Sequence, residues 1–189
     1  NNAAMVSLSF SRDSILFKSL PTNFITPALF DFEMLRVFGV TSASKHQNFD
    51  SLFVPFRCVA ADIKNKREHI FRSGHLNHAI RASMTFPFYV NPIRVDGVLL
   101  FDGGLYNNFP ADLMYQEFSP DFIIGSNVSD NSIDPNEDDI LSQMKAAMVR
   151  ETRFEIPCEY GLLIKHDMSI GTFDFDKVKE AIQIGYDNT

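Results

Sequence analysis

The sequence has no tryptophan, few cysteines, few basic residues and no long apolar run, and these absences narrow the classes of function. Cys58 and Cys158 lie far apart, which is neither a disulfide framework nor a zinc-binding pattern. No apolar run approaches the roughly 18 residues that a membrane-spanning helix needs. The 17 Lys and Arg residues against 24 Asp and Glu give a net charge of -7. Because binding to a phosphate backbone depends on clustered Lys and Arg, the composition argues against a nucleic-acid partner.

What is present is the composition of a folded protein. Of 189 residues, 45% are hydrophobic and 22% are charged, which favours a packed core over disorder. The length suits one domain or most of a larger one, and we expect residues 1–189 to belong to a single domain. Core packing is the ordinary explanation for the 19 phenylalanines, and a subset that lines a groove for acyl chains is the alternative. The chain begins with Asn rather than Met, which indicates processing or truncation.

The most informative segment places one carboxylate, Asp102, before two glycines at the end of an apolar run. Asp96-Gly97 predicts a hairpin turn, followed by a buried strand that ends at Asp102. Glycines lack Cβ, so Gly103 and Gly104 can take positive φ and let a ligand or another backbone segment approach the carboxylate. Two interpretations stay open on these residues alone: a common Asp-Gly turn, or a carboxylate that takes part in catalysis.

Helix-like and strand-like patterns alternate along the chain. Strands are predicted at residues 54–63, 70–71, 98–101, 122–125 and 162–164. Helices are predicted at residues 24–38 with a break at Pro27, at 76–83, at 111–118, behind an Asp134 cap, and at 178–184. The first of these helices would bury Phe24, Ile25, Ala28, Leu29, Phe32, Leu35 and Val37. The strand at 122–125 is expected to be buried on both faces, and the alternation favours an α/β fold with a largely parallel sheet.

Four blocks, in this order and spacing, carry a resemblance: residues 56–62, 71–76, 79–87 and 102–110. In them the chain resembles the carboxyl-terminal half of the catalytic domain of the patatin-like phospholipase family. The likeness covers about residues 50–189. Residues 173–176 and the pair Gly185-Tyr186 are similar to the segment that closes this domain in bacterial members. The resemblance favours the catalytic interpretation of Asp102.

The resemblance implies a three-layer α/β/α patatin-like fold with a largely parallel central sheet, incomplete at its amino-terminal side. It also implies a lipid acyl hydrolase that uses a serine–aspartate dyad, with no cofactor and no metal. Asp102 would be the general base, and Gly103 and Gly104 would support the active site. The implied substrate is a phospholipid or another acyl ester, reached through peripheral contact with a membrane. Bacterial members include exported, outer-membrane-associated proteins, so export is a further expectation.

The chain departs from the family because it has no Gly-x-Ser-x-Gly nucleophile elbow. Residues 40–44 echo that motif without its glycines, and we interpret Ser42 as a loop residue. Ser83 is interpreted as a packing serine near the end of a helix. We therefore expect the nucleophile and the oxyanion loop to lie upstream of Asn1, which would leave this chain inactive by itself.

Other polar groups have simpler interpretations. His75 and His78 share an i, i+3 spacing, but no nearby Cys, Asp or Glu completes a metal site, so we interpret them as solvated. The acidic residues between 130 and 139 lack the glycine and the spacing of an EF-hand and favour the amino terminus of a helix. The alternative function is a non-catalytic relative that keeps the fold and binds lipids or a protein partner.

Overall fold

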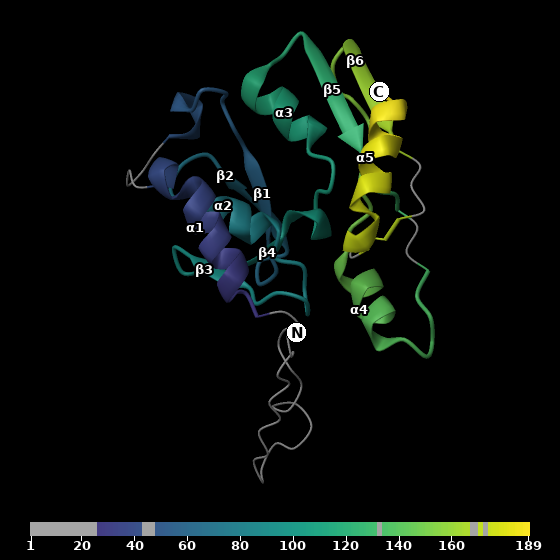
Figure 1. Ribbon diagram of the computed structural model, residues 1–189. Helices are drawn as coiled ribbons and strands as arrows, with labels where there is room; N and C mark the ends of the chain where they lie inside the picture. The colour runs from purple at the N-terminus through teal and green to yellow at the C-terminus, as the bar shows by residue number, and fades with distance from the viewer. Residues whose placement is uncertain (1–25, 43–47, 132–133, 167–169, 172–173) are drawn as a thin grey trace. The chain divides into compact units, whose positions relative to one another are not determined.

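A computed structural model of the chain describes residues 26–42, 48–131, 134–166, 170–171 and 174–189 (Figure 1). The chain divides into two compact units, Asn1–Tyr106 and Asn107–Thr189. Among the described residues, each unit has its own β-sheet, with four strands in the first and two in the second.

The first unit is built on an antiparallel sheet in the order β2-β1-β4-β3 (Figure 1). Its strands are β1 (Cys58–Asp62), β2 (Arg67–Phe71), β3 (Ile93–Val95) and β4 (Val98–Asp102). The predicted Asp96-Gly97 turn is confirmed, because these two residues join β3 to β4 with positive φ values of 48° and 82°. β4 also ends at Asp102, as predicted, and Asp102 lies opposite Ala60 of β1.

The α/β class is confirmed, and both kinds of strand pairing occur. The parallel pairing expected of the sheet is found between β5 (Phe122–Asn127) and β6 (Tyr160–Lys165) in the second unit. The four strands of the first unit pair antiparallel instead. Short turns join β1 to β2 and β3 to β4, and a parallel pair would need a much longer crossover.

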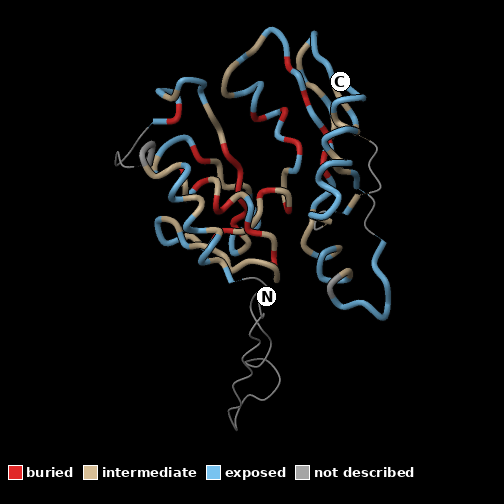
Figure 2. Tube along the Cα trace, viewed as in Figure 1, coloured by how far each residue is buried: buried red, intermediate tan, exposed pale blue. Residues whose placement is uncertain are grey.

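One helix packs against the sheet of the first unit and builds its core. The helical segments of this unit are α1 (Ala28–Ser42), η1 (Phe49–Ser51), α2 (Leu76–Ser83) and η2 (Gly103–Leu105). α2, at its predicted position, packs against β1 and β4. Figure 2 shows that many buried residues of this unit lie on α2, β1 and β4. The core consists of Phe49, Cys58, Ala60, Phe71, Leu76, Ala79, Ala82 and Leu100.

α1 begins after Pro27, as predicted, but the expected buried face was wrong. Leu29, Phe32 and Leu35 are 70%, 60% and 57% exposed. Phe30 and Phe38 are half-buried instead, and Phe38 packs against the core. Apolar residues occur all around this helix, so their spacing could not select the face that packs.

The second unit follows the predicted order of helices and strands. Its remaining elements are α3 (Ala111–Phe118), α4 (Ile140–Met148), η3 (Phe175–Lys177) and α5 (Val178–Asp187). α3 and β6 lie where they were predicted, and α5 begins at the predicted residue. Among the described residues, no helix is long and apolar enough to cross a membrane.

Two predictions in the second unit were wrong in detail. β5 is buried on one face only, because Ile123 and Gly125 are buried whereas Phe122 and Ile124 are 53% and 67% exposed. The helix expected behind Asp134 begins later, at Ile140. The Asn136 side chain accepts a hydrogen bond from the Asp138 N–H at 2.8 Å, and this local turn competes with a helical start.

Candidate active site

Asp102 is held in place by the main chain on both sides of β4. On one side β4 pairs with β1, and Ala60 lies opposite Asp102. On the other side the Asp102 N–H donates to the Thr85 carbonyl at 2.9 Å. Thr85 follows the end of α2 and is fully buried. The position of the carboxylate is therefore set by the pairing of β4 with β1 and by the contact with Thr85.

The two carboxylate oxygens of Asp102 have different surroundings. Oδ1 accepts the Gly104 N–H at 2.8 Å, so Asp102 caps the short helix η2. Within the described part of the chain, Oδ2 accepts no hydrogen bond. Burial raises the pKa of Asp102, and the Gly104 N–H opposes that shift. Asp102 thus has the local structural role of a cap, which is close to the Asp-Gly turn of the first interpretation, but this role engages only one of its two oxygens.

Asp62, at the opposite end of the paired strands, provides a contrast. Its two oxygens accept the Asn65 main-chain N–H at 3.1 Å and the Asn65 side-chain amide at 2.6 Å. Arg67 Nε lies 3.5 Å from Oδ2. The side-chain hydrogen bond from Asn65 is the main cause that lowers the pKa of Asp62. Both oxygens of Asp62 thus accept hydrogen bonds within the protein. In Asp102, by contrast, one oxygen accepts none from the described residues, and burial raises the pKa.

The glycines after Asp102 act differently from the expectation. Neither Gly103 nor Gly104 has positive φ, so that prediction was wrong. The close approach of another backbone segment is confirmed at Gly103. A Cβ there would lie 2.7 Å from the Val59 carbonyl carbon and nearer still to its oxygen. Gly103 therefore lets η2 lie directly on β1, and Gly104 donates the N–H that fixes Asp102 Oδ1.

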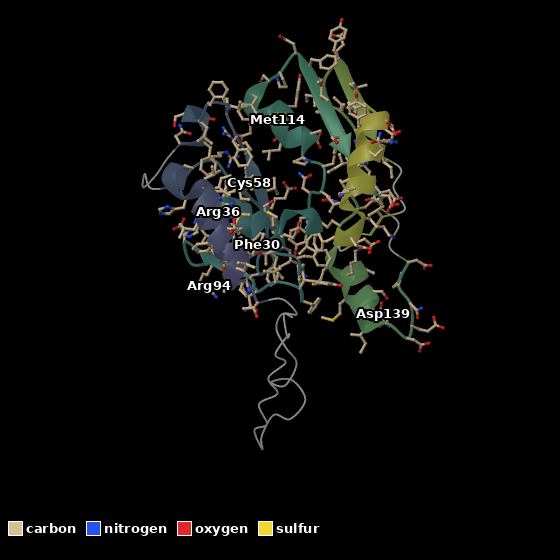
Figure 3. The ribbon with its side chains drawn as sticks, in the orientation of Figure 1. Phe30, Arg36, Cys58, Arg94, Met114 and Asp139 are labelled. Atoms are coloured by element: carbon tan, nitrogen blue, oxygen red, sulfur yellow. The ribbon has the colours of Figure 1, made fainter. Side chains whose placement is uncertain are left out.

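Cys58 lies close enough to Asp102 to be affected by its charge, and it also contacts Ser83, which the sequence did not indicate. Cys58, labelled in Figure 3, is buried on β1, and its thiol donates to the Ala79 carbonyl at 3.3 Å. Burial raises the pKa of Cys58, a hydrogen bond with Ser83 opposes this, and the charge of Asp102 adds to it. A buried neutral thiol is a poor nucleophile. Ser83 is the last residue of α2, which agrees with its interpretation as a packing serine near a helix end.

The remaining candidate residues lie elsewhere. Ser42 is the last residue of α1, so its interpretation as a loop residue was wrong: the helix continues past residue 38. The His75 and His78 rings are 5.1 Å apart, and both side chains are exposed. No group of three or more His, Cys, Asp or Glu able to hold a metal occurs among the described residues. Phe173, in the tail that carried part of the resemblance, lies outside them.

A serine–histidine contact in the second unit was not anticipated. Ser126 Oγ lies 3.3 Å from His166 Nε2 at the carboxyl ends of β5 and β6. A catalytic imidazole is normally oriented by a third group on its other nitrogen. Among the described residues, His166 Nδ1 has no hydrogen-bond partner. The pair therefore lacks the third member of a catalytic triad in the part of the chain that is described.

Arg81 and Thr85 also escaped the sequence analysis. Both are buried, and Thr85 contacts the main chain of Asp102 directly. The available signal was an arginine directly before Ala82, on a helix whose other buried residues are apolar. A buried arginine requires several partners.

Comparison with known proteins identifies related chains. The family model described as patatin-like phospholipase matches residues 4–115. A patatin-like phospholipase domain-containing protein of Caenorhabditis elegans is 27% identical over 175 residues, which cover 75% of this chain and 16% of the relative. Patatin-like phospholipase domain-containing protein 6 of Mus musculus is 34% identical over 94 residues, covering 49% of this chain and 6% of that protein.

A fungal protein is also similar. The lysophospholipase NTE1 of Mycosarcoma maydis is 32% identical over 76 residues, which cover 40% of this chain and 4% of that protein. The chain thus spans only 4% to 16% of the length of these relatives. All three are eukaryotic, so the bacterial likeness of the tail stays a prediction.

Proposed function

Because the chain belongs to the patatin-like phospholipase family, we propose that it is part of a lipid acyl hydrolase in which Asp102 is the general base. The state of the Asp102 carboxylate is the observation that carries this proposal. One oxygen is fixed by Gly104, the other is unengaged among the described residues, and burial raises the pKa. A general base near neutral pH needs this combination of fixed position and increased proton affinity.

The proposed reaction is acyl transfer through a serine. Asp102 takes the proton of the serine hydroxyl while that oxygen attacks the ester carbonyl, and the proton then passes to the departing alcohol. In the second half, Asp102 takes a proton from the water that attacks the acyl-enzyme, and it returns this proton to the serine oxygen as the fatty acid is released. The carboxylate needs no histidine as an intermediate because it contacts the hydroxyl itself.

We place the serine and its oxyanion loop in a segment of the parent protein before residue 1. Two observations support this placement. The 189 residues contain no Gly-x-Ser-x-Gly motif, and the relatives are several times longer than the stretch that matches. On this proposal, the 189-residue chain alone hydrolyses no ester.

We further propose that residues 1–189 contribute to one catalytic domain. The family match, residues 4–115, runs across the boundary between the two compact units, which supports this assignment. The substrate would be a phospholipid or another acyl ester, taken up through peripheral contact with a membrane. The names of the relatives, phospholipase and lysophospholipase, favour this substrate class.

The experiment compares the full-length protein with its Asp102→Asn variant. Hydrolysis of lysophosphatidylcholine and of a short-chain p-nitrophenyl ester is measured, with folding monitored by circular dichroism. We expect turnover by the parent protein and a loss of about 100-fold or more in the variant. A folded full-length protein that hydrolyses neither ester and binds lipid vesicles would instead be a non-catalytic lipid-binding relative.

A further inference from the structure

Arg81 is a buried cation with partners on three different segments of the first unit. It is 6% exposed. Its Nε lies 2.5 Å from Asp31 of α1, and its Nη2 donates to the Asn91 carbonyl at 3.0 Å. Its Nη1 donates to Thr85 Oγ1 at 2.5 Å. The guanidinium also lies over the ring of Phe30, labelled in Figure 3, at 5.4 Å from the ring centre.

Thr85 connects this cation to Asp102. Its hydroxyl donates to the Arg81 carbonyl at 2.8 Å while it accepts from the guanidinium, so both contacts fix Thr85 two residues after the end of α2. Its own carbonyl then accepts the Asp102 N–H at 2.9 Å. β3 pairs with β4 only as far as Leu100, opposite Ile93. At Asp102, the Thr85 carbonyl therefore takes the place that a β3 carbonyl would have had.

We propose that Arg81 and Thr85 are positioning residues for Asp102: the guanidinium holds Thr85, and the Thr85 carbonyl sets the main chain that carries the base. This inference rests on the proposed role of Asp102. Neither side chain touches the reacting atoms. Their effect is on where the unengaged Asp102 oxygen lies, and a misplacement of about 1 Å is enough to reduce turnover about 100-fold.

The simpler role for Arg81 is to fasten α1 to α2 through Asp31. The two roles involve different nitrogens of the same guanidinium, Nε for Asp31 and Nη1 for Thr85. Asp31 lies on α1 and is half-exposed. Removal of the Asp31 charge therefore tests the fastening role, and removal of the Thr85 hydroxyl tests the positioning role.

The test uses four variants of the full-length protein. Thr85→Val removes the hydroxyl and keeps the carbonyl and most of the volume, while Thr85→Ser restores the hydroxyl. Arg81→Lys keeps the charge but replaces the planar fork, whose three nitrogens reach Asp31, Thr85 and Asn91, by a single ammonium group. Asp31→Asn is the matched control that leaves the Arg81–Thr85 contact in place. For each variant, kcat and KM for an acyl ester are measured beside the free energy of unfolding in urea.

We expect Thr85→Val and Arg81→Lys to lower kcat by about 10- to 100-fold with little change in KM. Thr85→Ser should recover most of kcat, and Asp31→Asn should lower stability more than kcat. A kcat within about twofold of the parent in folded Thr85→Val would overturn the inference. If Thr85→Val does not fold, the same criterion is applied to kcat of folded Arg81→Lys. Should Asp102→Asn itself retain full turnover, the proposed function fails, which is a separate outcome.

Discussion

Gly103 offers the most specific perturbation of the candidate site, because a single added methyl group meets backbone rather than a flexible side chain. In Gly103→Ala, the new Cβ would lie 2.7 Å from the Val59 carbonyl carbon and 3.3 Å from the Ala60 nitrogen. The carbonyl oxygen of Val59 is closer still. Both neighbours belong to β1, whose pairing with β2 and β4 prevents an easy shift.

The magnitude follows from the shift that the clash demands. To move from 2.7 Å to an ordinary contact of 3.4 Å with the Val59 carbonyl carbon, η2 must move away from β1 by at least about 0.7 Å, and the closer carbonyl oxygen demands a larger shift. Overpacking of this kind costs about 1–3 kcal/mol of stability. Because Asp102 directly precedes Gly103, the same shift moves the carboxylate, and we expect a loss of turnover of roughly 10- to 100-fold.

The assay measures the free energy of unfolding in urea and kcat for an acyl ester in the full-length protein. Gly185→Ala is the matched control: it makes the same chemical change inside α5, where nothing lies within 4 Å of the added Cβ. The control should be neutral or stabilising by about 0.5–1 kcal/mol. If Gly103→Ala unfolds and turns over like the control, then close packing of η2 on β1 does not fix Asp102.

Two further predictions concern buried titratable groups. In the native protein, a thiol reagent should modify the partly exposed Cys158 and leave the buried Cys58 unmodified until the protein unfolds; equal labelling rates would contradict its burial. Asp102→Asn should stabilise the protein near neutral pH, because burial raises the pKa of Asp102 in the folded state. The folded protein then holds that proton more tightly than the unfolded chain, so its stability falls as the pH rises from about 4 through the folded pKa. The difference between the unfolding free energies of Asp102→Asn and the parent, measured in urea, should therefore shrink as the pH falls toward 4. A variant less stable than the parent at pH 7 would contradict this prediction.

The sequence predicted those parts of the fold that local residues determine. Asp96 and Gly97 define their turn within two residues, so the hairpin and the end of β4 at Asp102 followed directly. α3 begins behind Pro110, as a proline at a helix start indicates. The start of α4 was missed because the Asn136 side chain stabilises a competing turn, which a capping pattern alone does not reveal.

The contacts around Asp102 could not be predicted from neighbouring residues, because they join segments that are far apart in the sequence. The ion pair between Asp31 and Arg81 joins residues 50 positions apart, and Thr85 meets Asp102 only because α2 packs against β4. The approach of Gly103 to β1 likewise depends on sheet pairing. The residues around Asp102 therefore indicate which carboxylate to consider, whereas the contacts that hold it depend on the tertiary fold.

The central claim, that Asp102 activates a serine, is tested most directly by the rate at which a fluorophosphonate probe labels the full-length protein. The comparison is between Asp102→Asn and Asp96→Asn, the latter an exposed turn position of the same hairpin with positive φ, which asparagine tolerates. We predict that Asp96→Asn labels at the parent rate and that Asp102→Asn labels about 100- to 10,000-fold more slowly. Labelling of folded Asp102→Asn at the parent rate would contradict the account.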